Sequence, residues 1–141
     1  MGYFNQYVRA ESLEEAYGLY QKKNNFVLGG MLWLKMRKRP FGTAIDLSDL
    51  GLDQIEEDEK EFRIGAYVSL RELETNEALN TYTKGAFAES VKHIVGVQFR
   101  NVATVGGSLW GRYGFSDVMT IFRAMGAKVQ LHHAGILDLD E

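Results

Sequence analysis

Two glycine pairs in this chain each directly follow a short apolar run. Gly29-Gly30 comes after Phe26–Leu28, and Gly106-Gly107 comes after the β-branched run Val102–Val105. Each run predicts a strand, and glycines at a strand end present backbone N–H groups with no Cβ to block a ligand. Clustered N–H donors of this kind suit phosphate oxygens. The two pairs together therefore predict the two halves of a site for a cofactor pyrophosphate.

Neither glycine pair matches the common nucleotide-binding signatures. No Gly-Lys-Ser/Thr follows either pair, and neither has the spacing G-x-G-x-x-G, so a P-loop and the usual dinucleotide fingerprint are disfavoured. A single Gly-Gly more often only turns the chain or permits close packing. The recurrence of the pair after a second apolar run is what favours a ligand over that simpler role.

The composition of the 141 residues is ordinary for a globular protein. Hydrophobic residues make up 45% and charged residues 25%, and a net charge of −3 gives no basic field for a nucleic-acid partner. The absence of cysteine excludes disulfides, thiolate catalysis and an iron–sulfur cluster held by this chain alone. No apolar run approaches the roughly 20 residues of a membrane span, and the first residues do not resemble a signal peptide. We therefore expect a cytoplasmic protein with no membrane or nucleic-acid partner.

Residues about 1–50 form the first of two expected lobes. Ser12–Glu15 fits a capping box and predicts a helix that ends at Asn24-Asn25. The apolar patterns beyond it predict a small βαβ unit. Its strand, helix and strand are Phe26–Leu28, Met31–Met36 and Ala44–Leu47.

Residues about 51–141 form the second, larger lobe, in which sheet and helix are mixed. The acidic turn Glu56–Glu59 predicts an exposed hairpin between residues 52–55 and 61–64. Capping and periodicity signals predict three helices and two further strands. The helices begin at Ser69, at about Lys84 and at Ser116 or Asp117, and the strands are Lys128–Leu131 and Ile136–Leu139.

The residues around both glycine pairs resemble the flavin-binding subunit of molybdenum hydroxylases, the group of xanthine dehydrogenase and carbon monoxide dehydrogenase. That family has a strand leading into a loop usually written A-G-G-T-D, which Leu28–Leu32 matches here. Further along, it has a segment like Q-x-R-N-x-x-T-x-G-G-N, which Gln98–Ser108 matches, and then an Asp before an apolar helix, which Asp117 matches. Four other stretches look similar to the family, so that the resemblance covers essentially the whole chain. They are Ser12–Ala16, Ile45–Ser48, Arg63–Ala66 and Phe122–Val129.

The resemblance implies an α+β, two-lobed FAD-binding domain of the vanillyl-alcohol-oxidase/PCMH-like type, with FAD across both lobes and its pyrophosphate held by both glycine loops. Met31 and Leu32 replace the family's Thr and acidic residue, and Ser108 replaces its Asn. We therefore expect Val102–Ser108 to make most of the contacts that hold FAD. The positions that the resemblance assigns to cofactor binding are Leu28, Gly29, Gly30, Met31, Leu32, Trp33, Ile94, Thr104, Gly106, Gly107, Ser108 and Asp117.

The same resemblance implies an oxidoreductase component that transfers electrons. No Ser–His–Asp arrangement or close carboxylate pair stands out in the sequence, so we expect no catalytic residues on this chain. Family members receive electrons from molybdopterin on a large subunit through 2Fe-2S clusters on a small subunit, and pass them from FAD to NAD or another acceptor. The family continues well beyond 141 residues into a separate C-terminal domain. Two alternatives stay open: a truncated, flavin-free scaffold or subunit-binding module, and a flavoprotein similar to the UDP-sugar reductases of cell-wall synthesis.

Several other side chains have two possible roles. Gln98, Arg100 and Asn101 either brace the second glycine loop or form a solvated, internally paired segment. The basic run Lys35–Arg39 is either a solvated helix end or a docking patch for a partner subunit. Trp33 is expected to pack in the core. Three aromatic residues either stack on a cofactor or cover an interface: Trp110, Tyr113 and Phe115.

The adjacent histidines His132 and His133 are expected to point to opposite faces of a predicted strand. Because His93 is far away in the sequence and cysteine is absent, we expect no metal site on this chain.

Overall fold

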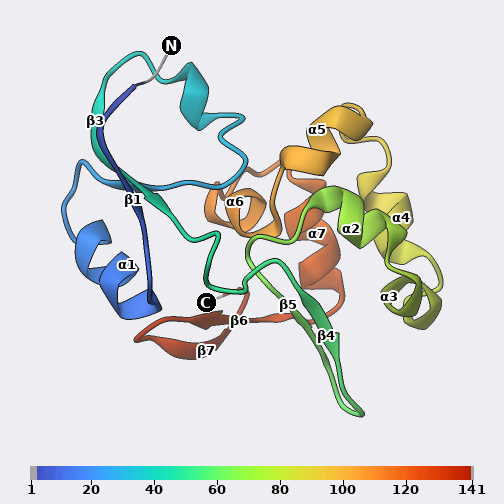
Figure 1. Ribbon diagram of the computed structural model, residues 1–141. Helices are drawn as coiled ribbons and strands as arrows, with labels where there is room; N and C mark the ends of the chain where they lie inside the picture. Colours follow the sequence, from blue (N-terminus) through green and yellow to red (C-terminus); the bar gives the residue numbers. More distant parts are fainter. Residues whose placement is uncertain (1–2, 141) are drawn as a thin grey trace.

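A three-stranded parallel sheet organises the N-terminal part of the computed structural model, which describes residues 3–140 (Figure 1). The strands are β1 (Phe4–Arg9), β2 (Phe26–Val27) and β3 (Phe41–Asp46), in the spatial order β1-β3-β2. Phe4 pairs with Phe41 on one side of β3, and Phe26 pairs with Ala44 on the other. The central position of β3 explains why most of its side chains are buried.

Helix α1 (Leu13–Tyr20) crosses from β1 to β2. As predicted, the Ser12 side chain caps it and accepts a hydrogen bond from the Glu15 N–H at 3.1 Å. The Glu15 carboxylate reaches back one residue further than a capping box requires, and accepts from the Glu11 N–H at 2.8 Å. Buried Asn25 then fixes the chain after the helix, because its amide oxygen accepts from the Thr43 N–H of β3 at 2.9 Å.

Two features of the N-terminal part differ from the expectation. Strand β1 has no counterpart among the predicted elements, because its sequence alternates only weakly between apolar and polar residues. The predicted helix over Met31–Met36 is wrong for its first half, and only the single 3-10 turn η1 (Leu34–Met36) forms. Met31 has a φ of +59°, a left-handed conformation that no helix can include.

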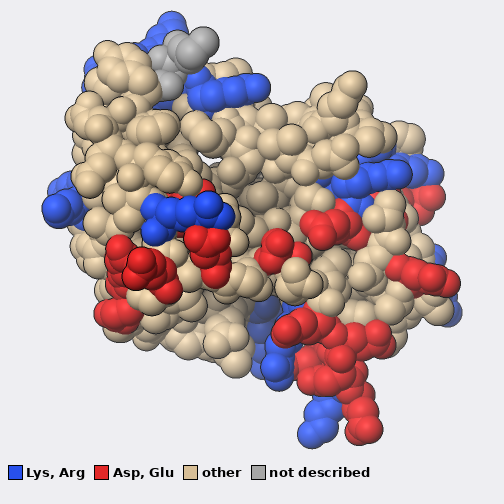
Figure 2. All heavy atoms as spheres, in the orientation of Figure 1, with Lys and Arg blue, Asp and Glu red and all other residues tan. Residues whose placement is uncertain are grey.

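The C-terminal part consists of short helices and two antiparallel hairpins. The first hairpin, with its acidic turn, projects away from the rest as predicted (Figures 1 and 2). The second lies beside α1 (Figure 1). The hairpin strands are β4 (Ile55–Glu57) with β5 (Phe62–Ile64), and β6 (Lys128–Leu131) with β7 (Gly135–Asp138). The helices are α2 (Leu70–Thr75), α3 (Glu77–Tyr82), α4 (Ala86–Val91), α5 (Val97–Val102), α6 (Val105–Trp110) and α7 (Asp117–Ala124).

The predicted strand over Val102–Val105 is wrong. Val102 ends α5, and Val105 begins α6, so that only Ala103 and Thr104 are extended between two helices. The extended pair lies against the start of α2, where the Leu70 N–H donates to the Ala103 carbonyl at 2.9 Å. A short apolar run does not distinguish a strand from a buried helix boundary, and here the glycines that follow it lie inside a helix.

Among the described residues, the buried hydrophobic side chains form three clusters. Two small clusters lie in the N-terminal part, centred on Ile45 and on Phe41. The large cluster joins α2, α3, α4, α6 and α7, with Leu73 and Val91 fully buried in it. Within residues 3–140, no helix is both long and apolar enough to cross a membrane.

Candidate functional site

A cavity of about 740 Å³ lies where the N-terminal and C-terminal parts face each other. Figure 2 shows the surface hollowed at this place. The sheet contributes the segment after β2, and the helical part contributes α6, the loop after it and the segment between α4 and α5. All twelve predicted cofactor positions line this one cavity. They are Leu28, Gly29, Gly30, Met31, Leu32, Trp33, Ile94, Thr104, Gly106, Gly107, Ser108 and Asp117.

The first glycine loop, Gly29–Trp33, lines the cavity and has unused backbone donors. Within residues 3–140, none of its N–H groups donates a hydrogen bond to another protein group. The preceding residue is fixed, since the Leu28 N–H donates to the Ile45 carbonyl at 2.8 Å. Successive free N–H groups in a turning backbone form a concave site for an anion, so this loop has the donor set expected of a phosphate-binding element.

The second glycine pair does not present free donors. The Gly106 N–H donates to the Ala66 carbonyl at 2.8 Å, and the Gly107 N–H donates to the Thr104 side chain at 3.1 Å. The Ser108 hydroxyl donates to the Thr104 carbonyl at 2.9 Å. We expected Val102–Ser108 to make most of the contacts that hold FAD. For backbone donors this expectation is wrong. The first loop holds those donors.

The two glycine loops are in direct contact. A Cβ on Gly30 would lie 2.1 Å from the Val102 carbonyl oxygen, and a Cβ on Gly29 would lie 2.9 Å from Thr104 Oγ1. Gly106 is packed as tightly, with Ala66 atoms 2.8 Å from its ideal Cβ position. Close packing, the simpler role of a glycine pair, thus accounts for Gly30 and Gly106, and it brings the free donors of one loop next to the Thr104 hydroxyl of the other.

Tyr67 lines the cavity and was not identified from the sequence. Its hydroxyl donates to the Leu28 carbonyl and accepts from the Leu47 N–H at 3.0 Å. Burial raises the pKa of Tyr67, although the Leu47 hydrogen bond opposes this, so the group remains a neutral hydroxyl. A residue of the C-terminal part thereby fixes the carbonyl just before Gly29. A lone tyrosine after a glycine-rich strand end gives no sequence signal for such a role.

Arg37 is the second unpredicted residue of the site. The basic run that contains it was expected to be either a solvated helix end or a docking patch for a partner subunit. Arg37 instead is half-buried, lines the cavity and lies over the Phe26 ring at 4.6 Å from the ring centroid. Its Nε is buried and, among the described residues, has no hydrogen-bond partner. An unpaired buried donor on a cation is unfavourable unless an anion completes it.

Exposed aromatic side chains surround the cavity mouth. Trp33 is 57% exposed, so the expectation that it packs in the core is wrong. Its ring centroid lies 5.7 Å from that of Tyr113, which stacks on Phe115. Trp110 also lines the cavity and is exposed. Asp117 is exposed at the first position of α7, beside the same cavity.

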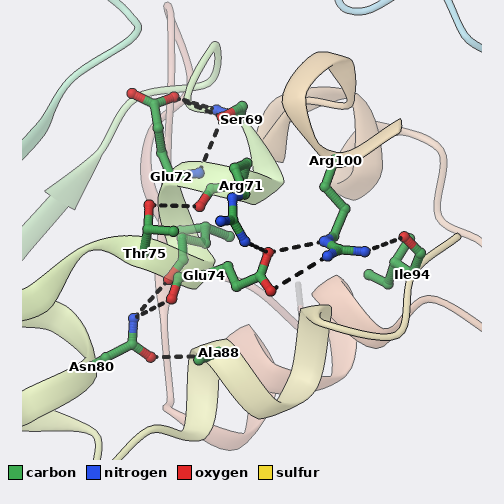
Figure 3. Close-up of polar contacts among 10 residues, drawn as sticks. Ser69, Arg71, Glu72, Glu74, Thr75, Asn80, Ala88, Ile94 and Arg100 are labelled. Atoms are coloured by element: carbon green, nitrogen blue, oxygen red, sulfur yellow. Dashed lines mark hydrogen bonds and ion pairs between the residues drawn. The ribbon is translucent and has the colours of Figure 1, made fainter. Parts of the chain in front are cut away.

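Arg100 is buried and internally paired, which is the second of its two predicted roles, and its contacts lie at Glu74 and Ile94 and not at the second glycine loop (Figure 3). Its guanidinium donates to the Ile94 carbonyl at 3.2 Å and to the Glu74 carboxylate at 2.9 Å. Arg71 binds the same carboxylate at 2.8 Å. Burial by itself raises the pKa of Glu74, but hydrogen bonds from the two arginines outweigh it and hold this pKa below its usual value. Gln98 is exposed on the same helix.

A second polar cluster lies away from the cavity. The expectation that His132 and His133 face opposite sides is wrong, because both imidazoles contact Glu14 of α1. The two histidines lie in the turn between β6 and β7 rather than in a strand. In this turn, the alternation of side chains that holds along a strand does not apply.

Comparison with known proteins gives matches over nearly the whole chain. Residues 3–137 match the family described as FAD binding domain in molybdopterin dehydrogenase. The chain is 27% identical over 96% of its length to the uncharacterized protein YgfM of Escherichia coli K12, of which it covers 52%. The chain thus spans about half the length of the curated relatives it matches.

Two solved structures share the fold. Reconstituted CO dehydrogenase from Oligotropha carboxidovorans superposes with a TM-score of 0.84 at 24% identity, over 96% of this chain and 50% of that one. CO dehydrogenase from Hydrogenophaga pseudoflava, in a form lacking the Mo-pyranopterin moiety of its cofactor, gives 0.81 at 25% identity, again over 96% and 50%. With the family match over nearly all its length, the chain belongs to the FAD-binding domains of the molybdopterin dehydrogenase family, within the molybdenum hydroxylases.

Proposed function

We propose that this chain holds FAD in the cavity between its two parts and serves as the electron-transfer component of a molybdenum hydroxylase-type oxidoreductase. The observation that carries the proposal is the run of free N–H groups at Gly29–Trp33, in a loop that lines one cavity together with Thr104. FAD supplies the redox chemistry when bound, and the protein supplies position and electrostatics.

The residues lining the cavity fit this cofactor. The backbone donors of Gly29–Trp33 suit a pyrophosphate without needing a lysine, and the unpaired Arg37 Nε supplies positive charge at the same cavity. The rest of the lining is mainly apolar and aromatic, which suits the flat rings of a dinucleotide. Asp117 would accept hydrogen bonds from hydroxyl groups of the ligand.

The proposal is tested by titrating FAD against the protein and following the quenching of flavin fluorescence. A side chain at position 107 would start 2.9 Å from Thr104 Oγ1, the hydroxyl that also lies beside Gly29. A carboxylate in Gly107→Asp would therefore face the donors of the first loop and repel a pyrophosphate. Gly107→Asn has the same shape without the charge and is the matched control.

We expect Gly107→Asp to bind FAD about tenfold more weakly than Gly107→Asn, because an added negative charge near a phosphate costs about 1–2 kcal/mol in a partly solvated site. Position 107 is the third residue of α6, where an acidic side chain is compatible with the helix. Equal affinities for the two variants would contradict the proposed pyrophosphate site.

We propose that the partners are a large subunit carrying molybdopterin and a small subunit carrying 2Fe-2S clusters, that NAD or another acceptor takes the electrons from FAD, and that the complex is cytoplasmic. Membership of the family supports this arrangement. Affinity purification from the native cell, followed by mass spectrometry, would test it. Recovery of the chain without a molybdopterin protein would contradict it.

A flavin-free binding module is the competing function. The exposed aromatic residues at the cavity mouth favour it, because Trp110 and Phe115 are 66% and 74% exposed and would suit a protein partner. The visible spectrum of the purified protein separates the two functions. Flavin absorption supports the cofactor site, and a colourless protein that does not take up added FAD supports the binding module.

A further inference from the structure

Three side chains of types that bind metal ions lie together between α1 and the last hairpin, away from the cavity. Glu14 comes from α1, and His132 and His133 come from the turn between β6 and β7. Nε2 of His132 lies 2.9 Å from Glu14 Oε2, and Nε2 of His133 lies 2.8 Å from the same oxygen. The ligand atoms of all three residues lie within 4.8 Å of one another.

The backbone of the turn explains how adjacent histidines meet on one side. His133 has a φ of +69°, in the left-handed region that few residues other than glycine adopt. This conformation turns its side chain toward that of His132, so the ring centroids lie 4.4 Å apart and the rings are nearly perpendicular. Left-handed backbone at a non-glycine residue is unfavourable and is often found at functional sites.

Tyr17 holds the histidine rings from the helix side. It lies three residues after Glu14, on the same face of α1. Its ring stacks on His133 at 4.3 Å between centroids and meets the edge of His132 at 5.6 Å. The rotations of both imidazoles are therefore restricted while their Nε2 atoms point to the carboxylate.

We propose that Glu14, His132 and His133 form a binding site for Zn²⁺. Two imidazole nitrogens and one carboxylate oxygen are a common zinc ligand set, with a water molecule as the fourth ligand. Two ligand atoms of a tetrahedral zinc lie roughly 3.3 Å apart, given bond lengths near 2.0 Å. Small side-chain rotations open the present N···O separations to that value, and the exposure of the cluster leaves room for the water.

The site would select zinc over the hard cations. Imidazole nitrogen is a good ligand for Zn²⁺, whereas Mg²⁺ and Ca²⁺ prefer oxygen and Mg²⁺ releases its water molecules reluctantly. The single carboxylate at this cluster offers too few oxygens for either of them.

Metal binding would connect the two parts of the molecule. Glu14 lies on the helix of the N-terminal sheet, whereas the histidines lie more than a hundred residues later, in the last hairpin. The ion would therefore restrict the movement of the sheet relative to the helical part, whose facing surfaces form the cavity.

Calorimetric titration of the untagged chain, dialysed against EDTA, with Zn²⁺ tests the proposal. We expect one ion per chain with micromolar affinity. His132→Ala, His133→Ala and Glu14→Gln should each weaken binding by at least about tenfold. His93→Ala is the matched control, because it removes the one other histidine of the sequence and should leave the affinity unchanged. Mg²⁺ should give no heat of binding.

Two further measurements test the zinc site without calorimetry. Zn²⁺ should raise the melting temperature of the wild-type chain and of His93→Ala, but not that of His132→Ala. Co²⁺ in place of Zn²⁺ should give visible absorption bands of a four-coordinate ion, which disappear in the His133→Ala variant. The proposal would be overturned if the wild type did not bind zinc. It would also be overturned if His132→Ala and His133→Ala bound zinc as strongly as the wild type does.

Discussion

The Tyr67 hydroxyl binds two backbone groups, the Leu28 carbonyl and the Leu47 N–H. The first glycine loop begins directly after Leu28. The Leu28 carbonyl that accepts its hydrogen bond belongs to the residue before Gly29. Because the N–H of Leu28 is also bound, to the Ile45 carbonyl, both ends of this residue are held. The direction in which the free donors of the loop point therefore depends on a side chain from the other part of the molecule.

We predict that Tyr67→Phe lowers the free energy of unfolding by about 1–3 kcal/mol, because the Leu28 carbonyl and the Leu47 N–H lose their partner in a half-buried place. FAD binding should weaken as well. Urea unfolding and flavin fluorescence measure the two effects. Tyr82→Phe is the control, since Tyr82 is 74% exposed and its change should stay within about 0.5 kcal/mol.

Gly30 and Gly18 should respond to alanine in opposite directions. In Gly30→Ala the new Cβ would lie 2.1 Å from the Val102 carbonyl oxygen, so the two glycine loops must separate, at a cost of about 1–3 kcal/mol. In Gly18→Ala the Cβ meets nothing within 4 Å and replaces a glycine inside α1, which should stabilise the protein by about 0.5–1 kcal/mol.

Thermal or urea unfolding of both variants, with FAD titration of Gly30→Ala, measures these changes. An unchanged stability in Gly30→Ala would mean that the contact between the loops is not maintained in solution.

The short helices around the cavity depend on polar contacts between them, and Glu74 of α2 is central among these (Figure 3). It pairs with Arg71 of its own helix and with Arg100 of α5, whose side chain is only 6% exposed. Removing one member of a buried ion pair leaves an uncompensated charge. Arg100 in turn holds the Ile94 carbonyl, so this pair fixes the part of the cavity wall that precedes α5.

We predict that Glu74→Gln lowers stability by about 3 kcal/mol at pH 7. The pKa of Glu74 is lower in the folded chain than in the unfolded one, so its contribution is complete above the unfolded pKa and is lost as the pH falls through the folded value. Urea unfolding should therefore show the two proteins converging below about pH 4. Glu89→Gln, whose pair with Lys92 is exposed, should change stability by no more than about 0.5 kcal/mol at either pH.

The family resemblance and the apolar pattern of the sequence had different outcomes. All twelve positions that the resemblance assigns to the cofactor line one cavity, whereas the apolar run Val102–Val105, which predicted a strand, lies at a boundary between helices. A motif records which residues meet a ligand, whereas the type of element depends on contacts distant in the sequence. Here those contacts come from residues 66–70, which hold Ala103–Gly106 by backbone hydrogen bonds.

Single backbone angles account for other differences. Left-handed Met31 prevents the predicted helix from starting, and left-handed His133 brings two histidines to one carboxylate. Positive φ values at non-glycine residues leave almost no trace in a sequence. The occupied donors of Gly106 and Gly107 were equally hidden, because an N–H group that is free for a ligand looks the same in sequence as one bound to Ala66 or Thr104.

In the whole molecule, the cavity exists only where the sheet and the helices face each other. Leu28, Gly29 and Gly30 come from one side, whereas Thr104 and Asp117 come from the other. The lining of the cavity is divided between the two sides, so any change in their relative position should affect FAD binding. Tyr67 near the cavity and the Glu14–His132–His133 cluster at the last hairpin connect the two sides at different places.

The strand order β1-β3-β2 has a consequence for synthesis on the ribosome. Within this sheet, β1 is synthesised first and has no partner until β3 emerges, since Phe4 pairs with Phe41 and β2 also pairs only with β3. A nascent chain ending before residue 41 therefore carries two unpaired strands and the glycine loop between β2 and β3. The glycine loop gains its orientation only when β3, the last strand of this sheet, is synthesised, so the proposed binding of FAD has to follow translation of the central strand.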